Sequence, residues 1–184
     1  HLERIAHYSR LIARQLANSY PISDEFVEDI FRYAPLHDVG KITIPDCILL
    51  KPGPLTPNER EIMKTHACEG RKMIDAMLRN FQFEGIKNIG MIHNIVAHHH
   101  EMIDGSGYPD GLSGQAIPLE ARIVAVADVF DALTTERPYK KPWSNARACA
   151  ELERLSASKL DPDCVAALLR SPQEIEEIQR SFAD

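Results

Sequence analysis

Histidines and aspartates recur along this 184-residue chain at positions where a helical pattern would turn them inward. A triplet, His98 to His100, precedes Glu101 and a glycine-rich stretch, and the pair His37-Asp38 follows an amphipathic segment. Histidine and carboxylate side chains together form a ligand set for divalent metals such as Zn, Mn and Fe. A buried acid is costly unless it is paired or bound to a cation. These residue types could therefore support a metal centre.

Helical spacing predicts which of these side chains share the apolar faces. His37 stands seven residues after Ile30, His99 stands seven after Ile92, and Asp128 lies within the apolar run RIVAVADVF. A single inward histidine is usually an ordinary core residue, but this chain has a whole set. The polar residues predicted to point inward are His1, His37, Asp38, His66, His99, His100 and Asp128.

One ion would leave several of these ligands unused. A shared carboxylate such as Asp38 could bridge two ions about 3.5–4 Å apart, as in two-metal phosphoesterases. Neighbours on a helix stand about 100° apart, so the adjacent His99 and His100 can address two adjacent ions. His98 points elsewhere, and we expect it to be a non-ligand, like His7 and His93.

Helices must position these residues. Apolar spacing predicts helices over 2–18, 24–38, 86–101 and 119–135. Thr56-Pro57-Asn58-Glu59 has the N-cap, first-turn proline and capping-box glutamate of a helix start, and His66 is expected on that helix. Three further helix starts are predicted at Ser144, Asp161-Pro162 and Ser171-Pro172. The sequence therefore predicts an all-α chain forming one domain over residues 1–184.

Two segments depart from the helical pattern. Residues 39–55 and 104–118 are rich in proline and glycine and are predicted to be loops. Each follows a polar cluster, and loops in such places often carry function. The stretch KITIPDCILL (41–50) is the only strand candidate. We interpret residues 75–94 as a segment that packs on the bundle and forms a loop.

Composition narrows the classes of function. A net charge of −6 argues against binding to a nucleic acid polymer. No apolar run approaches the length of a membrane span, so no membrane contact is expected. The four cysteines are scattered without a C-x-x-C pair, which favours reduced thiols in a cytoplasmic protein. Because the chain begins with His1 rather than Met, we expect it to be part of a longer protein.

Four stretches of the sequence resemble the HD-GYP family of HD metal-dependent phosphohydrolases. LHDVGK (36–41) is similar to the HD motif, and the later blocks are IPDCILLKPGPLTPNEREIMKTH (44–66), HHEMIDGSGYPDGL (99–112) and ARIVAVADVFDALTTERPYKK (121–141). The resemblance runs from His1 to about Val165. It implies a single HD-type helical domain with a metal site in the core of the bundle. It also implies a phosphodiesterase that hydrolyses cyclic di-GMP to pGpG, GMP or both.

The resemblance also implies roles for individual residues. The implied metal ligands are His1, His37, Asp38, His66, His99, His100 and Asp128, with Asp38 bridging. Asp38 and Lys41 are the implied catalytic residues, and Lys41 is expected to reach the scissile phosphate. Arg137 and Lys140 resemble positions that hold the phosphates or guanines of the substrate. Gly107, Tyr108 and Pro109 form the Gly-Tyr-Pro triplet, for which contact with a diguanylate cyclase is expected.

Two divalent ions, iron or manganese, are expected as cofactors, and ligand type does not separate these metals. Members with three metals carry a glutamate one turn before the first-helix histidine, a position that would precede residue 1, so no third metal is expected here. The resemblance further implies an upstream sensory or receiver domain in the parent protein. Two alternatives stay open: a catalytically weak receptor or interaction module that uses the Gly-Tyr-Pro loop, and an enzyme for another phosphoester.

Overall fold

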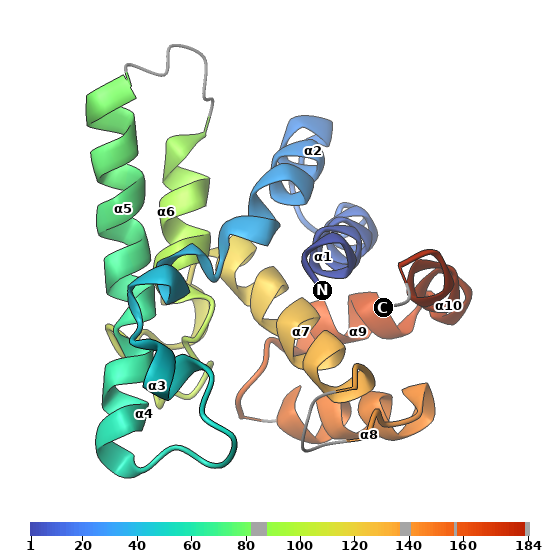
Figure 1. Cartoon of the computed structure of the whole chain (residues 1–184). Coiled ribbons are helices and arrows are strands. Elements are labelled where there is room, and N and C mark those ends of the chain that lie inside the picture. Colours follow the sequence, from blue (N-terminus) through green and yellow to red (C-terminus); the bar gives the residue numbers. More distant parts are fainter. Residues whose placement is uncertain (82–87, 137–140, 157, 183–184) are drawn as a thin grey trace.

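The computed structural model describes residues 1–81, 88–136, 141–156 and 158–182, and its elements in these ranges are helices (Figure 1). The α-helices are α1 (Leu2–Leu16), α2 (Asp24–Tyr33), α3 (Asp46–Leu49), α4 (Pro57–Lys64), α5 (His66–Phe81), α6 (Ile89–His98), α7 (Leu119–Thr134), α8 (Asn145–Ser156), α9 (Pro162–Leu169) and α10 (Pro172–Ser181). The 3-10 turns are η1 (Ala34–Leu36), η2 (Val39–Thr43) and η3 (Gly114–Ala116). The all-α prediction is confirmed for these residues, whose one β pairing is an isolated bridge between Asp104 and Ser113. No helix in the described ranges combines the length and the apolar character that a membrane span requires.

Helix α7 crosses the middle of the bundle, with α5 and α6 side by side on one flank and α8 to α10 on the other (Figure 1). Its residues from Ile123 to Ala127 are all buried, as is Phe130. A helix that is apolar on most sides is stable only when neighbours cover it. Helix α1 is one of these neighbours, and the ring of its Tyr8 meets that of Phe130 edge to face at 5.3 Å. Polar side chains on the central helix therefore have to lie inside the bundle.

The predicted helix starts are confirmed. The Thr56 side chain accepts from the Glu59 amide while the Glu59 side chain accepts from the Thr56 amide, which completes a capping box. Asp161 accepts from the first-turn amides of α9. Helix α10 begins at Pro172 as expected, but the Ser171 hydroxyl makes no cap hydrogen bond and instead accepts from the Gln15 side chain.

Three predictions about residues 39–94 are wrong. The strand candidate KITIPDCILL contains the 3-10 turn η2 and the short helix α3, in which tight turns satisfy the backbone, as in the Lys41 amide donating to the Asp38 carbonyl at 2.9 Å. Residues 75–81 are helical, and His66 begins α5 rather than lying on α4. The reason is tertiary packing, because Ile74 of α5 forms a small core with Ile92 and Val96 of α6.

The turn η2 lies directly on the backbone of α5. A Cβ atom on Gly40 would stand 1.9 Å from the His66 carbonyl oxygen and 2.5 Å from the Gly70 amide nitrogen. Neither backbone atom can yield as a flexible side chain would. Glycine at position 40 therefore permits the contact that brings the His37-Asp38 turn next to His66.

We predict that Gly40→Ala destabilises the fold by about 1–3 kcal/mol or more, because the new methyl group overlaps backbone atoms. The measurement is the free energy of unfolding from denaturant titration. Gly90→Ala is the matched control, since Gly90 has no neighbouring atom within 4 Å of an added Cβ. That variant should be neutral or more stable by up to about 1 kcal/mol. Equal stabilities for the two variants would contradict the close contact.

Candidate metal centre

His37 and Asp38 stand in a turn that a proline creates. The predicted helix over 24–38 is too long, because α2 ends at Tyr33 and Pro35 lies in the following 3-10 turn η1. Proline lacks an amide N–H and clashes with the preceding helical turn, so it ends a helix. The chain then turns inward and buries the His37 side chain completely.

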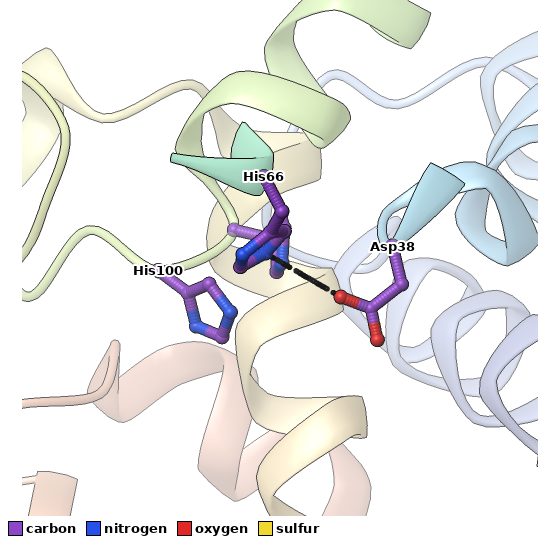
Figure 2. A group of neighbouring side chains, drawn as sticks. Asp38, His66 and His100 are labelled. Carbon is purple, nitrogen blue, oxygen red and sulfur yellow. Dashed lines mark hydrogen bonds and ion pairs between the residues drawn. The ribbon is translucent and has the colours of Figure 1, made fainter. Parts of the chain in front are cut away.

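Three further histidines come from helix ends. His66 is the first residue of α5, His99 caps the C-terminus of α6, and His100 follows it. Figure 2 shows His66, His100 and Asp38 pointing from separate elements into a common space. The Nε2 atoms of His66 and His99 lie 3.5 Å apart. Residues distant in sequence thus face one another around a small volume.

Asp38 stands between two groups of imidazoles. Its Oδ1 lies 3.5 Å from His66 Nε2 and 3.8 Å from His99 Nε2. Its Oδ2 lies 3.3 Å from His37 Nε2 and 2.6 Å from Lys41 Nζ. Asp38 belongs to two groups of possible ligand atoms, each within 4.8 Å: one of Asp38, His66, His99 and His100, and one of His1, His37 and Asp38. The shared carboxylate has the placement that a bridging ligand needs.

Three of the rings have their proton position fixed by a nearby carbonyl. The Nδ1 atoms of His37, His66 and His99 lie 2.9, 2.7 and 3.0 Å from the carbonyl oxygens of Ala34, Met63 and Ile95. A carbonyl oxygen only accepts, so each Nδ1 donates. Each neutral ring then presents the lone pair of Nε2 to the cluster, as metal-binding histidines do.

The three histidine rings grouped with Asp38 are neutral. Burial lowers the pKa of His66 and of His99, and that of His100 to about 3, so these rings are neutral at pH 7. Among the described residues, His37 Nε2 and Asp38 Oδ1 are buried atoms without a hydrogen-bond partner. Opposed lone pairs beside a buried carboxylate repel one another unless a cation lies between them. The residues therefore fit a bound divalent ion.

The group of His1, His37 and Asp38 lies next to a second carboxylate, that of Asp128. Burial lowers the pKa of His37, but the carboxylates of Asp38 and Asp128 outweigh this effect and raise the pKa overall. Asp128, on α7, has Oδ1 3.9 Å from His37 Nε2 and 3.9 Å from His1 Nε2. This position favours positive charge, which a metal ion supplies. The structure thus brings all seven predicted ligands to two adjoining places.

Lys41 and Tyr108 lie at the edge of the cluster. The Lys41 side chain is 38% exposed, and its ammonium pairs with Asp38. Burial raises the pKa of Asp38, but His37 and Lys41 outweigh it and hold that pKa well below its usual range. The Tyr108 ring lies 4.8 Å from the His100 ring, and burial, with the charges of Asp38 and Asp128, raises its pKa, so the phenol keeps its proton.

The Gly-Tyr-Pro loop rests on the segment that carries His100. A Cβ on Gly107 would meet the backbone of Glu101 at 2.5 Å and that of Met102 at 2.4 Å, so only glycine fits there. Pro109 follows Tyr108 and is partly buried. The predicted substrate-binding residues Arg137 and Lys140 lie outside the described residues.

The remaining histidines lie away from Asp38. His7 packs against the rings of Phe31 and Phe182, and His93 pairs with Asp75 at 2.9 Å. His98 faces two acids instead, with Nδ1 3.9 Å from Glu101 Oε1 and 3.7 Å from Asp110 Oδ2. These three residues form a group of their own that does not include Asp38, and the bystander role of His98 at the Asp38 centre stays a prediction.

Sequence reasoning missed two buried acids beside the cluster. Glu101 accepts hydrogen bonds from the amides of Asp110 at 2.8 Å and Leu112 at 3.0 Å, just after the Gly-Tyr-Pro triplet. Asp131 accepts from His1 at 2.6 Å. The available signals were the place of Glu101 directly after His100 and the three-residue step from Asp128 to Asp131 within an apolar run.

Comparison with known families and proteins places the chain in the HD-domain family. A family profile described as "HD domain" matches residues 1–164. The chain is 48% identical over 182 residues to the cyclic di-GMP phosphodiesterase response regulator RpfG of Xanthomonas campestris, covering 99% of this chain and 45% of the relative. It is 44% identical over 184 residues to a cyclic di-GMP phosphodiesterase of Thermotoga maritima, covering 100% and 47%. It is 38% identical over 184 residues to the 3'3'-cGAMP-specific phosphodiesterase 2 of Vibrio cholerae, covering 100% and 33%.

Two solved structures share the fold. An HDG"Y"P protein from Bdellovibrio bacteriovorus aligns with a TM-score of 0.63 at 22% identity, over 91% of this chain and 51% of the other. A cyclic GMP-AMP-specific phosphodiesterase of Vibrio cholerae aligns with a TM-score of 0.67 at 20% identity, over 97% and 45%. The chain spans less than half the length of the curated relatives it matches.

We predict that His99→Ala and His100→Ala each lower the number of divalent ions bound per chain, whereas His98→Ala leaves it unchanged. The reason is that His99 and His100 belong to the group around Asp38 and His98 does not. Metal content after dialysis, measured by elemental analysis, checks this. A loss of metal in His98→Ala comparable to that in His99→Ala would contradict the assignment.

We also predict that Glu101→Gln costs about 1–3 kcal/mol of folding free energy, because one of the two loop amides loses its acceptor. Thermal and denaturant unfolding measure this loss. The control is Glu61→Gln, whose acid pairs with Lys64 on the surface and contributes at most about 1 kcal/mol. A stability for Glu101→Gln equal to that of the control would argue against the anchoring of the loop.

Proposed function

The chain belongs to the HD-domain family, in its HD-GYP branch, and we propose that it is a metal-dependent phosphodiesterase that hydrolyses cyclic di-GMP. The observation that carries the proposal is the single carboxylate of Asp38 shared between two groups of inward imidazoles. Relatives with 36–48% identity that are named cyclic di-GMP phosphodiesterases support the substrate. The product is pGpG, GMP or both.

Two divalent ions, iron or manganese, are the proposed cofactors. The proposed ligands are His1, His37, Asp38, His66, His99, His100 and Asp128. Imidazole and carboxylate suit both metals, and the absence of a cysteine from both groups argues against a thiolate site among the described residues. When bound, two such ions supply an acidified water as nucleophile and positive charge for the phosphate oxygens.

Lys41 is proposed to bind the scissile phosphate. Its ammonium stands beside Asp38 and is partly exposed, so it can turn toward a phosphate oxygen at the edge of the cluster. A cation placed there stabilises the charge that develops on the phosphate as the bond to the 3′ oxygen breaks. The role of Arg137 and Lys140 in holding the substrate stays a prediction.

The domain organisation, the partner and the location of the protein are proposals that rest on the family resemblance. We propose that residues 1–184 form one domain of a longer protein, with a sensory or receiver domain upstream. Contact of the Gly-Tyr-Pro loop with a diguanylate cyclase and a cytoplasmic location also stay predictions. A purely receptor-like role is less well supported, because a module that only binds a partner has no need for five imidazoles grouped around the Asp38 carboxylate.

We predict that the manganese-loaded or iron-loaded protein hydrolyses cyclic di-GMP and that Asp38→Asn reduces turnover by at least about 10³-fold, since both groups lose their shared ligand. Lys41→Ala should lower kcat by about 10²–10³-fold, in the range for loss of one stabilising charge. Product analysis by chromatography measures both effects and distinguishes pGpG from GMP.

The matched control is His98→Ala, which should keep wild-type turnover. Competition with 3'3'-cGAMP tests the choice of cyclic dinucleotide. Full turnover by Asp38→Asn would exclude the bridging role, and metal-loaded wild-type protein without hydrolysis would favour the receptor alternative.

A further inference from the structure

Asp131 is a buried carboxylate next to the metal centre. Its oxygens face His1 and Arg4 rather than Asp38. It lies on α7, and its side chain is 1% exposed. Oδ2 is 2.6 Å from His1 Nδ1, and Oδ1 is 2.6 Å from Arg4 Nε. The Thr135 hydroxyl also donates to Oδ2, at 3.2 Å. Both oxygens therefore have donors, and Asp131 is poorly placed to bind a metal itself.

The hydrogen bond from His1 completes a pattern seen in the other rings. His37, His66 and His99 each donate Nδ1–H to a carbonyl three or four residues earlier in the chain. His1 instead donates to a side chain 130 residues away. Because an ionised carboxylate only accepts, Nδ1 of His1 keeps its proton. Its Nε2 then offers a lone pair toward Asp128.

Arg4 explains how a carboxylate can be buried at this point. Its side chain is 5% exposed and forms an ion pair with Asp131, so the pair carries no net charge. Arg4 also donates to the Phe182 carbonyl at 2.5 Å and to the Thr135 hydroxyl at 3.2 Å. His1 is the N-cap residue of α1 and Arg4 lies in its first turn, so a single carboxylate holds the start of α1 against α7.

We propose that Asp131 is a positioning residue for the metal ion held by the group of His1, His37 and Asp38. This inference rests on the metal centre of the proposed function. Asp131 fixes the ring of His1 in the orientation and proton arrangement that metal binding requires, and it makes Nε2 a better electron donor. Carboxylate partners of this kind change metal affinity by about 10–100-fold in other sites.

A purely structural ion pair is the competing explanation, and the chain contains one for comparison. Arg122 and Asp161 pair at 2.5 Å between α7 and the start of α9, with side chains 11% and 7% exposed. Asp161 also accepts from the Asp163 and Cys164 amides. This second buried pair joins α7 to another helix, and within the described part of the chain the hydrogen bonds of Arg122 and Asp161 involve no histidine. Asp161→Asn keeps an oxygen that can accept from these amides, so it reports the loss of a buried ion pair that has no histidine partner.

The experiment measures Mn²⁺ binding to wild type, Asp131→Asn and Asp161→Asn by metal count and by titration against a chelator. In Asp131→Asn, one of two ions should bind about 10–100-fold more weakly, with the other unchanged. Asp161→Asn should lose stability yet bind both ions as wild type does. Two ions with wild-type affinity in folded Asp131→Asn would overturn the proposal, and so would equal losses of affinity in both variants.

A second variant covers the case in which Asp131→Asn does not fold. The paired replacement Arg4→Met with Asp131→Leu removes both charges together, which buried pairs tolerate better than loss of one partner. The same single weakened ion is expected, and wild-type affinities would overturn the proposal. The two hypotheses fail differently: wild type that binds two ions without hydrolysing cyclic di-GMP contradicts only the proposed function. Wild type that binds fewer than two ions contradicts the positioning role.

Discussion

One electrostatic constraint governs the centre of this protein: the buried groups that face one another there are hydrogen-bond acceptors. The rings of His66 and His99 direct Nε2 lone pairs at each other across 3.5 Å, and the ionised Asp38 lies beside them. Burial prevents water from screening this repulsion and lowers the pKa of both rings, which keeps protons from relieving it. Only a cation satisfies all of these groups at once, so the arrangement is stable as a metal site.

The fold maintains this unfavourable arrangement through its backbone. His66 begins α5 and His99 caps α6, and carbonyls within one turn hold the Nδ1 atoms of both rings. The close approach of Gly40 to α5 then brings Asp38 to the same place. Because backbone atoms make these contacts, the side chains have little freedom to turn away from one another. The stability of the surrounding helices therefore compensates for the repulsion at the centre.

Much of this could be predicted from the sequence, because helical spacing alone turns His99 and Asp128 inward and local chemistry marks starts such as Thr56. The break between α4 and α5 could not be predicted, because only Thr65 separates the two helices and neither glycine nor proline marks the break. The strand candidate over 41–50 failed because an alternating pattern also suits tight turns packed on a helix. Asp131 was missed because its partners lie 127 and 130 residues away, and spacing rules reach only along one helix.

The two groups of ligands consequently depend on different parts of the bundle. The group of His66, His99 and His100 requires only that α5, α6 and the turn η2 pack together, and local carbonyls hold the rings of His66 and His99. The group of His1 requires α1 to dock on α7, which is the packing of the main hydrophobic core. Asp38 belongs to both groups. The complete centre can therefore form only when both parts of the bundle are packed, which couples metal binding to the integrity of the whole core.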